Sequence, residues 1–165
     1  MSVTVDVQVN GLAELDQALA ELTERLAKKA INGALSYAAT PIVKDAKQSA
    51  AKAEQAHLMQ YGSSYKMVQP GLLKESIRRR RLKKFELVSL GASAGVAIYI
   101  GKGTQQKLYP RYWHFIEFGT SNMAAMPYLR PAFDRNRDVF IERFAKKLEQ
   151  NIVKYTPSQG DGDNP

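Results

Sequence analysis

The first forty residues carry two successive hydrophobic patterns. Valines at alternate positions, with polar residues between them, predict a half-buried strand from Val3 to Val9, and the turn dipeptide Asn10-Gly11 follows. Leucines then recur at three- and four-residue steps, which places one stripe on a helix. These are Leu12, Leu15, Leu19, Leu22 and Leu26. Small residues continue the helical composition to Ala39.

Pro41 interrupts this helical pattern. A proline inside a helix removes a backbone hydrogen bond and clashes with the preceding turn. Thr40-Pro41 instead suits an N-cap followed by the first helical position. We therefore predict a kink or a new helix here, continuing to about Gln55.

The middle of the chain alternates between loops and short elements. Residues 59–71 contain Gly, Ser and Pro, and predict a loop. Residues 71–77 predict a short helix with Leu73 and Ile77 on one side. Strand-type residues at 85–90 and 95–100, on either side of a Gly-rich turn, predict a hairpin whose second strand has Val96, Ile98 and Ile100 on one face. Residues 101–107 predict a connecting loop.

An aromatic run with two flanking prolines occupies residues 109–132 and includes Trp113, the only tryptophan. We expect it to be extended, then to turn at Gly119, which suits a positive φ, and at Thr120, whose hydroxyl can tie the turn. Met126 and Arg130 each precede a proline, which disfavours the helical region and predicts extended backbone. The whole segment is therefore predicted to be stiff.

The last apolar pattern predicts a C-terminal helix after Pro131. Phe133, Phe140, Phe144, Leu148 and Ile152 recur mostly at four-residue steps. The same spacing leaves five charged residues for water, namely Arg135, Asp138, Glu142, Lys146 and Glu149. Residues 156–165 have no large apolar side chain and predict a disordered tail.

These elements predict an α+β fold. A small antiparallel sheet packs against a long N-terminal helix, kinked or broken near Pro41, and against a C-terminal helix. The length of 165 residues suits one domain, which we place at residues 1–155. No apolar run approaches the ~18 residues of a membrane span, so no membrane association is expected. The absence of cysteine excludes disulfides and thiol catalysis.

The formal charge of +8 is concentrated between Lys74 and Lys84, where seven basic side chains face one acid. Such a block favours a polyanionic neighbour, which can be nucleic acid, an acidic protein face or anionic lipid; the alternative is a solvated, self-repelling surface. The residues that could face DNA or an acidic partner are Arg78, Arg79, Arg80, Arg81, Lys83 and Lys84.

Reactive groupings are not evident. His57 and His114 have no second ligand at metal-site spacing, so no metal, cofactor or catalytic residue is predicted. Gly101-Lys102-Gly103-Thr104 lacks the spacing of a phosphate loop and reads as a connector. Glu117, an acid inside an apolar run, predicts a structural ion pair or a subunit contact, because a buried unpaired charge is costly.

Two motifs carry a resemblance to a known family. Glu117-Phe118-Gly119-Thr120 is followed by Pro127-Tyr128-Leu129-Arg130-Pro131-Ala132, and Gly71-Leu72-Leu73-Lys74-Glu75-Ser76-Ile77 lies upstream. In this order they resemble the bacteriophage neck or tail-completion proteins similar to gene product ten of phage HK97, over residues 3 to 153. Pro70 stands where the family usually has Thr, Tyr128 where Phe is common, and the run Arg78–Arg81 is more basic than the family pattern.

The resemblance implies a non-enzymatic subunit of the head–tail junction in a long-tailed phage or prophage. It implies a homo-oligomeric ring around the DNA path, with a hexamer as one candidate, and contacts with tail-terminator, tail-tube and head-closure proteins. The location would be the virion, and the host cytoplasm before assembly. Residues 59–71 and 101–126 are the candidate contact segments, with Glu117, Phe118, Gly119, Thr120, Pro127, Tyr128, Arg130 and Pro131 as candidate assembly residues. The alternative is a non-specific nucleic-acid-binding protein that uses the run Lys74–Lys84.

Overall fold

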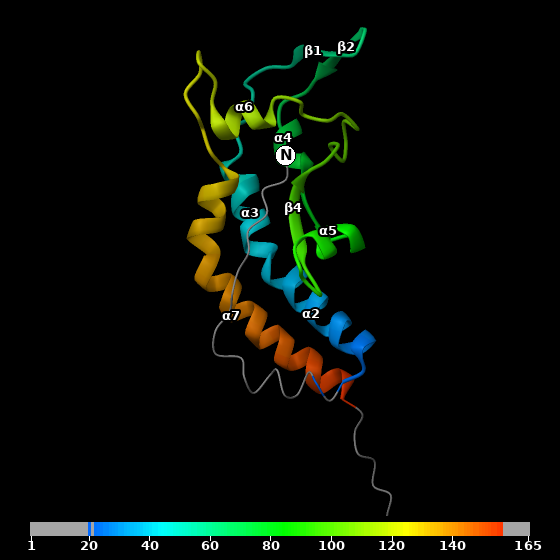
Figure 1. Ribbon diagram of the computed structural model, residues 1–165. Coiled ribbons are helices and arrows are strands. Elements are labelled where there is room, and N and C mark those ends of the chain that lie inside the picture. Colours follow the sequence, from blue (N-terminus) through cyan, green and yellow to red (C-terminus); the bar gives the residue numbers. More distant parts are fainter. Residues whose placement is uncertain (1–19, 21, 157–165) are drawn as a thin grey trace, which may run out of the picture. The chain divides into compact units, whose positions relative to one another are not determined.

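The computed structural model describes residue 20 and residues 22–156. Its helices are α2 (Glu24–Ala38), α3 (Thr40–Ser49), α4 (Leu72–Ser76), α5 (Lys84–Ser89), α6 (Trp113–Phe118) and α7 (Leu129–Tyr155). Its strands are β1 (His57–Tyr61), β2 (Ser64–Val68), β3 (Ile77–Arg81) and β4 (Val96–Ile100) (Figure 1). The predicted α+β class is confirmed. The predicted strand 3–9, the leucines before position 20 and the tail beyond Thr156 lie outside the described residues.

The predicted break near Pro41 is confirmed. Helix α2 ends at Ala38 and α3 begins at Thr40, which places Pro41 in a first turn, where a missing N–H costs little. Helix α3 ends at Ser49, before the predicted end near Gln55. Residues 52–58 are all exposed, so this segment has no buried stripe to stabilise a helix, whatever its composition.

The prediction of a loop at 59–71 is wrong, because most of this segment forms a β-hairpin. Strands β1 and β2 pair antiparallel, with Leu58 opposite Met67 and Gln60 opposite Tyr65. Gly62 lies in the turn with φ 64°. The Gly and Ser residues that suggested a loop form this turn and its flanks.

The second sheet pairs β3 with β4, so the predicted strand at 95–100 is confirmed but its predicted partner is wrong. The partner is the basic run Ile77–Arg81, whose arginines mask the strand pattern. Residues 84–89 form helix α5, which buries no residue, so their β-type side chains are not core positions. The Glu86 carboxylate accepts a hydrogen bond from the Lys83 N–H at 2.7 Å, which stabilises the start of α5.

Two further expectations fail around the aromatic run. Residues 113–118 are helical (α6) rather than extended, and Arg130 lies in α7 although it precedes Pro131. Helix α7 begins at Leu129, so Pro131 occupies its first turn, as predicted. The five charged residues expected on the outside of α7 are all exposed.

The chain divides into two compact units. Unit 1 contains Thr40–Arg80 and Ile98–Arg137, and unit 2 contains the described residues up to Ala39, with Arg81–Ala97 and residues 138–156. The single-domain boundary at residue 155 stays a prediction. Buried apolar side chains of unit 1 come from α3, β2, α4, the start of β3, α6 and the start of α7.

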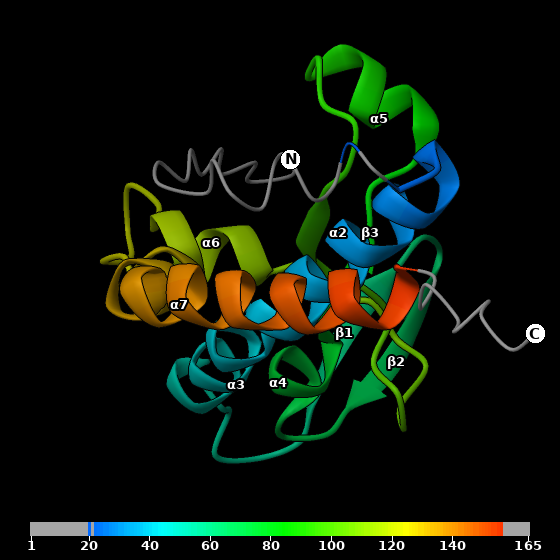
Figure 2. The ribbon, with the colours of Figure 1, turned by 90° about the horizontal axis from the view of Figure 1, so that it is seen from below.

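In unit 2, helix α2 and the C-terminal part of α7 lie side by side and antiparallel (Figure 2). Ala30, Ala34 and Ala38 are fully buried on α2, and α7 supplies Phe140, Phe144, Leu148 and Ile152. The buried Asn151 amide donates to the Ala30 carbonyl at 2.9 Å. A Cβ on Gly33 would lie 3.1 Å from Asn151 Nδ2, so small residues permit this close packing.

Candidate assembly site

Glu117 connects two of the sequence segments that carry the resemblance, residues 117–120 and residues 127–132, both in unit 1. Its side chain is buried at the C-terminal end of α6 and reaches the first turn of α7. Oε2 accepts hydrogen bonds from the N–H groups of Tyr128 at 2.8 Å and Leu129 at 2.9 Å, and Oε1 accepts one from Arg130 at 3.0 Å. The next residue, Pro131, has no N–H. The carboxylate thus satisfies the free donors at this end of α7 and opposes the positive end of the helix dipole.

The backbone between residues 117–120 and 127–132 folds back tightly toward α6. Gly119 has φ 73°, as predicted, and a Cβ there would lie 2.8 Å from both Ala125 N and Met123 O. Thr120 pairs with Met123, and its hydroxyl accepts a hydrogen bond from the Asn122 N–H at 3.3 Å, also as predicted. The Met126 N–H donates to the Ile116 carbonyl at 2.8 Å. This segment is therefore held against α6.

Tyr128 is fully buried beside these contacts. Burial, assisted by the nearby Glu117 charge, raises the pKa of the Tyr128 hydroxyl above its usual range. Tyr128 and Glu117 are thus buried beneath the surface of this junction. Phe118, Pro127 and Arg130 are exposed at that surface.

A pocket of about 390 Å³ lies at this junction. It is lined by Glu117, Phe118, Ala125, Pro127, Arg130, Pro131, Asp134 and Arg135. Five of these are candidate assembly residues from the sequence. Phe115, Phe118 and Met126 are each about half exposed nearby, at 46%, 48% and 53%. We call these three residues the corner patch.

An ion pair fixes the start of α7 to α3 within unit 1. Arg135 donates to Asp45 through Nε at 3.0 Å and Nη2 at 2.8 Å, and the Asn136 amide donates to Asp45 Oδ2 at 2.8 Å. The Arg135 hydrogen bond lowers the pKa of the Asp45 carboxyl, against a smaller opposing effect of burial. Sequence reasoning assigned Arg135 only to the solvent face and missed this pair.

The hairpin β1–β2 is a second distinctive surface of unit 1. Its inner face carries the buried Val68 and the half-buried Met59 and Tyr61. Its outer face carries Leu58, Tyr65 and Met67, which are 63%, 65% and 53% exposed. We call these three residues the hairpin face. Alternation along each strand produces this division.

The base of the hairpin is tied to the aromatic segment. The Tyr61 hydroxyl donates to the Tyr109 carbonyl at 2.7 Å, and Trp113 Nε1 donates to the Tyr109 hydroxyl at 2.8 Å. Gln106 exchanges two hydrogen bonds with the backbone of Gln69. The hairpin is thereby connected through Tyr109 to the start of α6.

The loop at 101–107 encloses a protein carboxylate. Glu75 accepts hydrogen bonds from the Thr104 hydroxyl and from the N–H groups of Gln105 and Gln106. A Cβ on Gly103 would overlap the Glu75 side chain. The anion bound by this loop is therefore the Glu75 carboxylate of the same chain.

The basic run divides along strand β3. The Arg78 guanidinium donates to the Lys102 carbonyl at 2.6 Å, and the Arg80 guanidinium lies 5.5 Å from the centre of the Tyr99 ring. Arg79 donates to the Thr40 hydroxyl at 2.7 Å. Arg81, Lys83 and Lys84 are exposed in unit 2, where Lys83 lies over the Phe85 ring. The basic side chains of this run thus lie in several different environments and do not form one continuous block.

Neither histidine has a metal-like environment in the part of the chain that the structure describes. His57 and His114 are exposed, and His114 packs on Phe115 with ring centres 4.0 Å apart. The described residues contain no cluster of three or more potential metal ligands. Within the same residues, no helix combines the length and apolarity needed to cross a bilayer.

These contacts fix backbone paths and leave the hairpin face and the corner patch exposed in the described part of the chain. A comparison with protein-family models matches residues 13–119 to the HK97-gp10-like family, described as "Bacteriophage HK97-gp10, putative tail-component". The chain belongs to this family and is a bacteriophage tail component, as the motif resemblance predicted. Searches of curated proteins and of solved structures each found no match.

Proposed function

We propose that this tail component is a non-enzymatic, ring-forming subunit of the head–tail junction. Its role is tail completion, so that finished tails join to heads. Its neighbours are further copies of the chain and tail-terminator, tail-tube or head-closure proteins. The number of subunits in the ring stays open, with a hexamer as one candidate, and the ring is located in the virion after assembly in the host cytoplasm.

The observation that carries this proposal is the presence of two unlike apolar surfaces on unit 1. A closed ring requires a heterologous interface, in which one surface of each subunit meets a different surface of the next. The hairpin face and the corner patch meet this requirement, and they lie on separate elements of the unit (Figure 1). A two-stranded hairpin with an uncovered apolar face is only marginally stable alone, so a covering partner benefits it.

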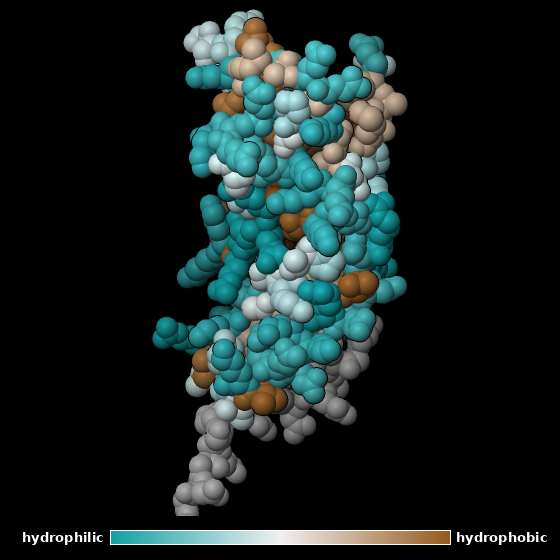
Figure 3. Space-filling view, turned by 180° about the vertical axis from the view of Figure 1, so that it is seen from behind, coloured by the Kyte–Doolittle hydropathy of each residue, from teal (hydrophilic) through white to brown (hydrophobic). Residues whose placement is uncertain are grey.

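The wider surface supports small, defined contacts. The side of the molecule shown in Figure 3 is mostly hydrophilic, with hydrophobic residues in separate small groups. Small scattered apolar groups are normal on a protein surface, so the proposal rests on the hairpin face and the corner patch and not on these groups. Arg130, at the edge of the corner patch, adds a residue type enriched in interfaces.

The test uses two variants that each damage one surface. Leu58→Ser with Met67→Ser removes the hairpin face, and Phe118→Ser with Met126→Ser removes the corner patch. Val153→Ser is the matched control, because Val153 is an exposed apolar residue, 72% accessible, in unit 2. Native mass spectrometry and solution scattering measure the assemblies.

A heterologous ring predicts that each variant alone is monomeric, because each lacks one half of every contact. Mixed together, the two variants should form one-to-one dimers, because each retains the surface that the other has lost. Wild type and the control should form closed rings at high concentration or with neck partners added. Only monomers of wild type under all these conditions would refute ring formation, and self-association of the corner variant alone would indicate a symmetric hairpin contact instead.

The junction role has its own test. Phage particles lacking the protein should show normal heads and tails that fail to join, or tails with a faulty end, by electron microscopy. Infectious, intact particles without the protein would contradict the proposed role. Contact with the DNA that passes through the junction is a further part of the proposal.

A further inference from the structure

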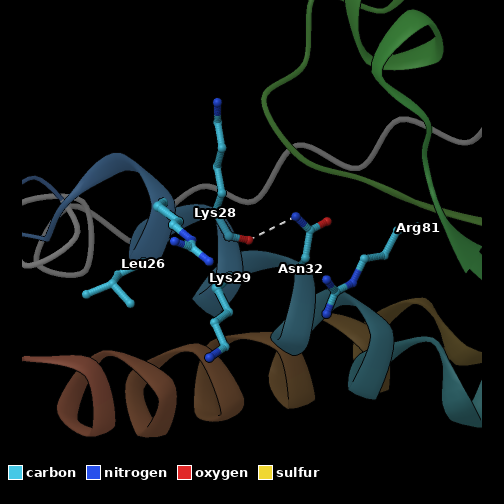
Figure 4. A pocket seen from close by; sticks show the side chains of 6 residues that line it. Leu26, Lys28, Lys29, Asn32 and Arg81 are labelled. Carbon is cyan, nitrogen blue, oxygen red and sulfur yellow. Dashed lines mark hydrogen bonds between the residues drawn. The ribbon is translucent and has the colours of Figure 1, made fainter.

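Unit 2 contains a basic pocket that the sequence does not show as a cluster. Its volume is about 720 Å³, and it is lined by Arg25, Leu26, Lys28, Lys29, Asn32 and Arg81 (Figure 4). Five of these residues lie on α2, and Arg81 is the last residue of β3. Among the residues that the structure describes, the lining has four cationic side chains and no carboxylate.

The basic residues follow from the helical repeat of α2. Arg25, Lys28, Lys29 and Asn32 are spaced by three and four residues, so they share one face of the helix. The opposite face buries Ala30, Ala34 and Ala38. The same packing that buries the alanines therefore turns this basic face outward.

Local contacts partly organise the site. Lys28 pairs with Glu24 one turn earlier, and the Asn32 amide donates to the Lys28 carbonyl at 2.9 Å. The Lys29 ammonium lies 5.0 Å from the centre of the Tyr155 ring. Lys28 and Lys29 extend in different directions, whereas Arg81 reaches toward Asn32 (Figure 4). The site is thus an open basic surface, which suits an extended polyanion better than a small enclosed anion.

We propose that this basic pocket binds the phosphodiester backbone of DNA. Lysine and arginine are the side chains that contact phosphates without regard to base sequence. An acidic protein partner is less favoured, because the described lining residues include one apolar side chain, Leu26, and no aromatic one, whereas protein contacts centre on aromatic and apolar anchors. Lys83 and Lys84, exposed shortly after Arg81 in the same unit, add to the positive field. This inference deepens the DNA contact proposed above.

The test measures fluorescence anisotropy of a labelled duplex of mixed sequence with the full chain over a range of salt concentrations. The pocket variant is Lys28→Ala with Lys29→Ala, and the control is Lys146→Ala with Lys154→Ala, two exposed lysines of α7 in the same unit. The slope of log K against log salt is about −0.9 for each phosphate neutralised, so two lost contacts should reduce it by about 2. The control variant should keep the wild-type slope. Lys28→Arg with Lys29→Arg should also keep it, because the charge is retained.

Two further arms separate this inference from ring formation and from a protein ligand. The hairpin variant, Leu58→Ser with Met67→Ser, should bind DNA through the pocket even as a monomer, so failure of the ring leaves the DNA result interpretable. A poly-glutamate chain of equal charge should compete weakly. Equal slopes for the pocket variant and the control would overturn the proposal, and competition by poly-glutamate as strong as by DNA would assign the pocket to an acidic protein. Circular dichroism confirms that each variant is folded.

Discussion

Removal of the Glu117 carboxylate should destabilise unit 1 strongly. In Glu117→Ala three backbone N–H groups lose their acceptor. An unsatisfied buried donor costs about 1–3 kcal/mol. The Tyr128 N–H is buried and should incur the full cost, whereas those of Leu129 and Arg130 are partly exposed and can bond to water. We therefore expect a loss of about 4 kcal/mol, or a fall in Tm of about 8–16 °C for a chain of this size.

Glu117→Gln should have an intermediate effect. The amide oxygen can still accept two hydrogen bonds, but the amide nitrogen faces a donor and the negative charge at the helix N-terminus is lost. We expect a loss of about 2 kcal/mol. The capping geometry thus predicts that stability decreases in the order wild type, Glu117→Gln, Glu117→Ala.

The assay is urea unfolding followed by tryptophan fluorescence. Trp113 is the only tryptophan, it is buried, and it begins the helix that ends beside Glu117. Its emission therefore reports directly on unit 1. Glu142→Gln, an exposed glutamate of α7, is the control and should change stability by less than about 0.5 kcal/mol. If Glu117→Ala is as stable as this control, the carboxylate does not stabilise the junction and our reasoning is wrong.

Two other changes test the same unit. Gly119→Ala should cost about 2 kcal/mol or more, because it combines a positive φ with backbone contacts of 2.8 Å, whereas Gly91→Ala, at φ 62° with open space around it, should cost only about 1 kcal/mol in urea unfolding. Equal losses of stability in the two variants would mean that the backbone contacts at Gly119 do not require a residue without a Cβ. Asp45→Asn should lower Tm at neutral pH. Because the folded-state pKa of Asp45 is lowered, its stabilisation is complete above the unfolded pKa of about 4 and is lost as pH falls through the folded value, so the difference in Tm between wild type and Asp45→Asn should shrink as the pH falls below about 4. A difference in Tm that stays constant as the pH falls below about 4 would contradict the ion-pair explanation.

The periodic parts of the fold could be predicted from the sequence, and the exposed strands could not. Helix α7 and the break before Pro41 follow from apolar spacing and from the chemistry of proline, which are local properties. Strands β1 and β2 carry apolar residues on an outer face that is exposed in the described part of the chain, so they lack the simple alternation of a half-buried strand. Strand β3 is harder still, because four consecutive arginines hide which positions face inward.

The candidate site was found in part. The sequence identified Glu117 as an acid that needed a partner and Pro131 as a first-turn residue, but not that one satisfies the other. An anion near a helix N-terminus was the available clue, although Glu117 and Tyr128 are eleven positions apart in the sequence and no periodic pattern connects them. The spacing of the basic residues of α2 can be read from the sequence. Their approach to Arg81 requires the fold.

The hydrogen-bonded connection from the hairpin through Tyr109 to Trp113 has a consequence for the proposed ring. A neighbour that immobilises the hairpin also restricts the segment that leads to the corner patch, so the next neighbour loses less conformational entropy on docking. The final contact that closes a ring is intramolecular, at an effective concentration on the order of millimolar. Open arcs should therefore be scarce, and dilution should convert complete assemblies to single subunits over a narrow range.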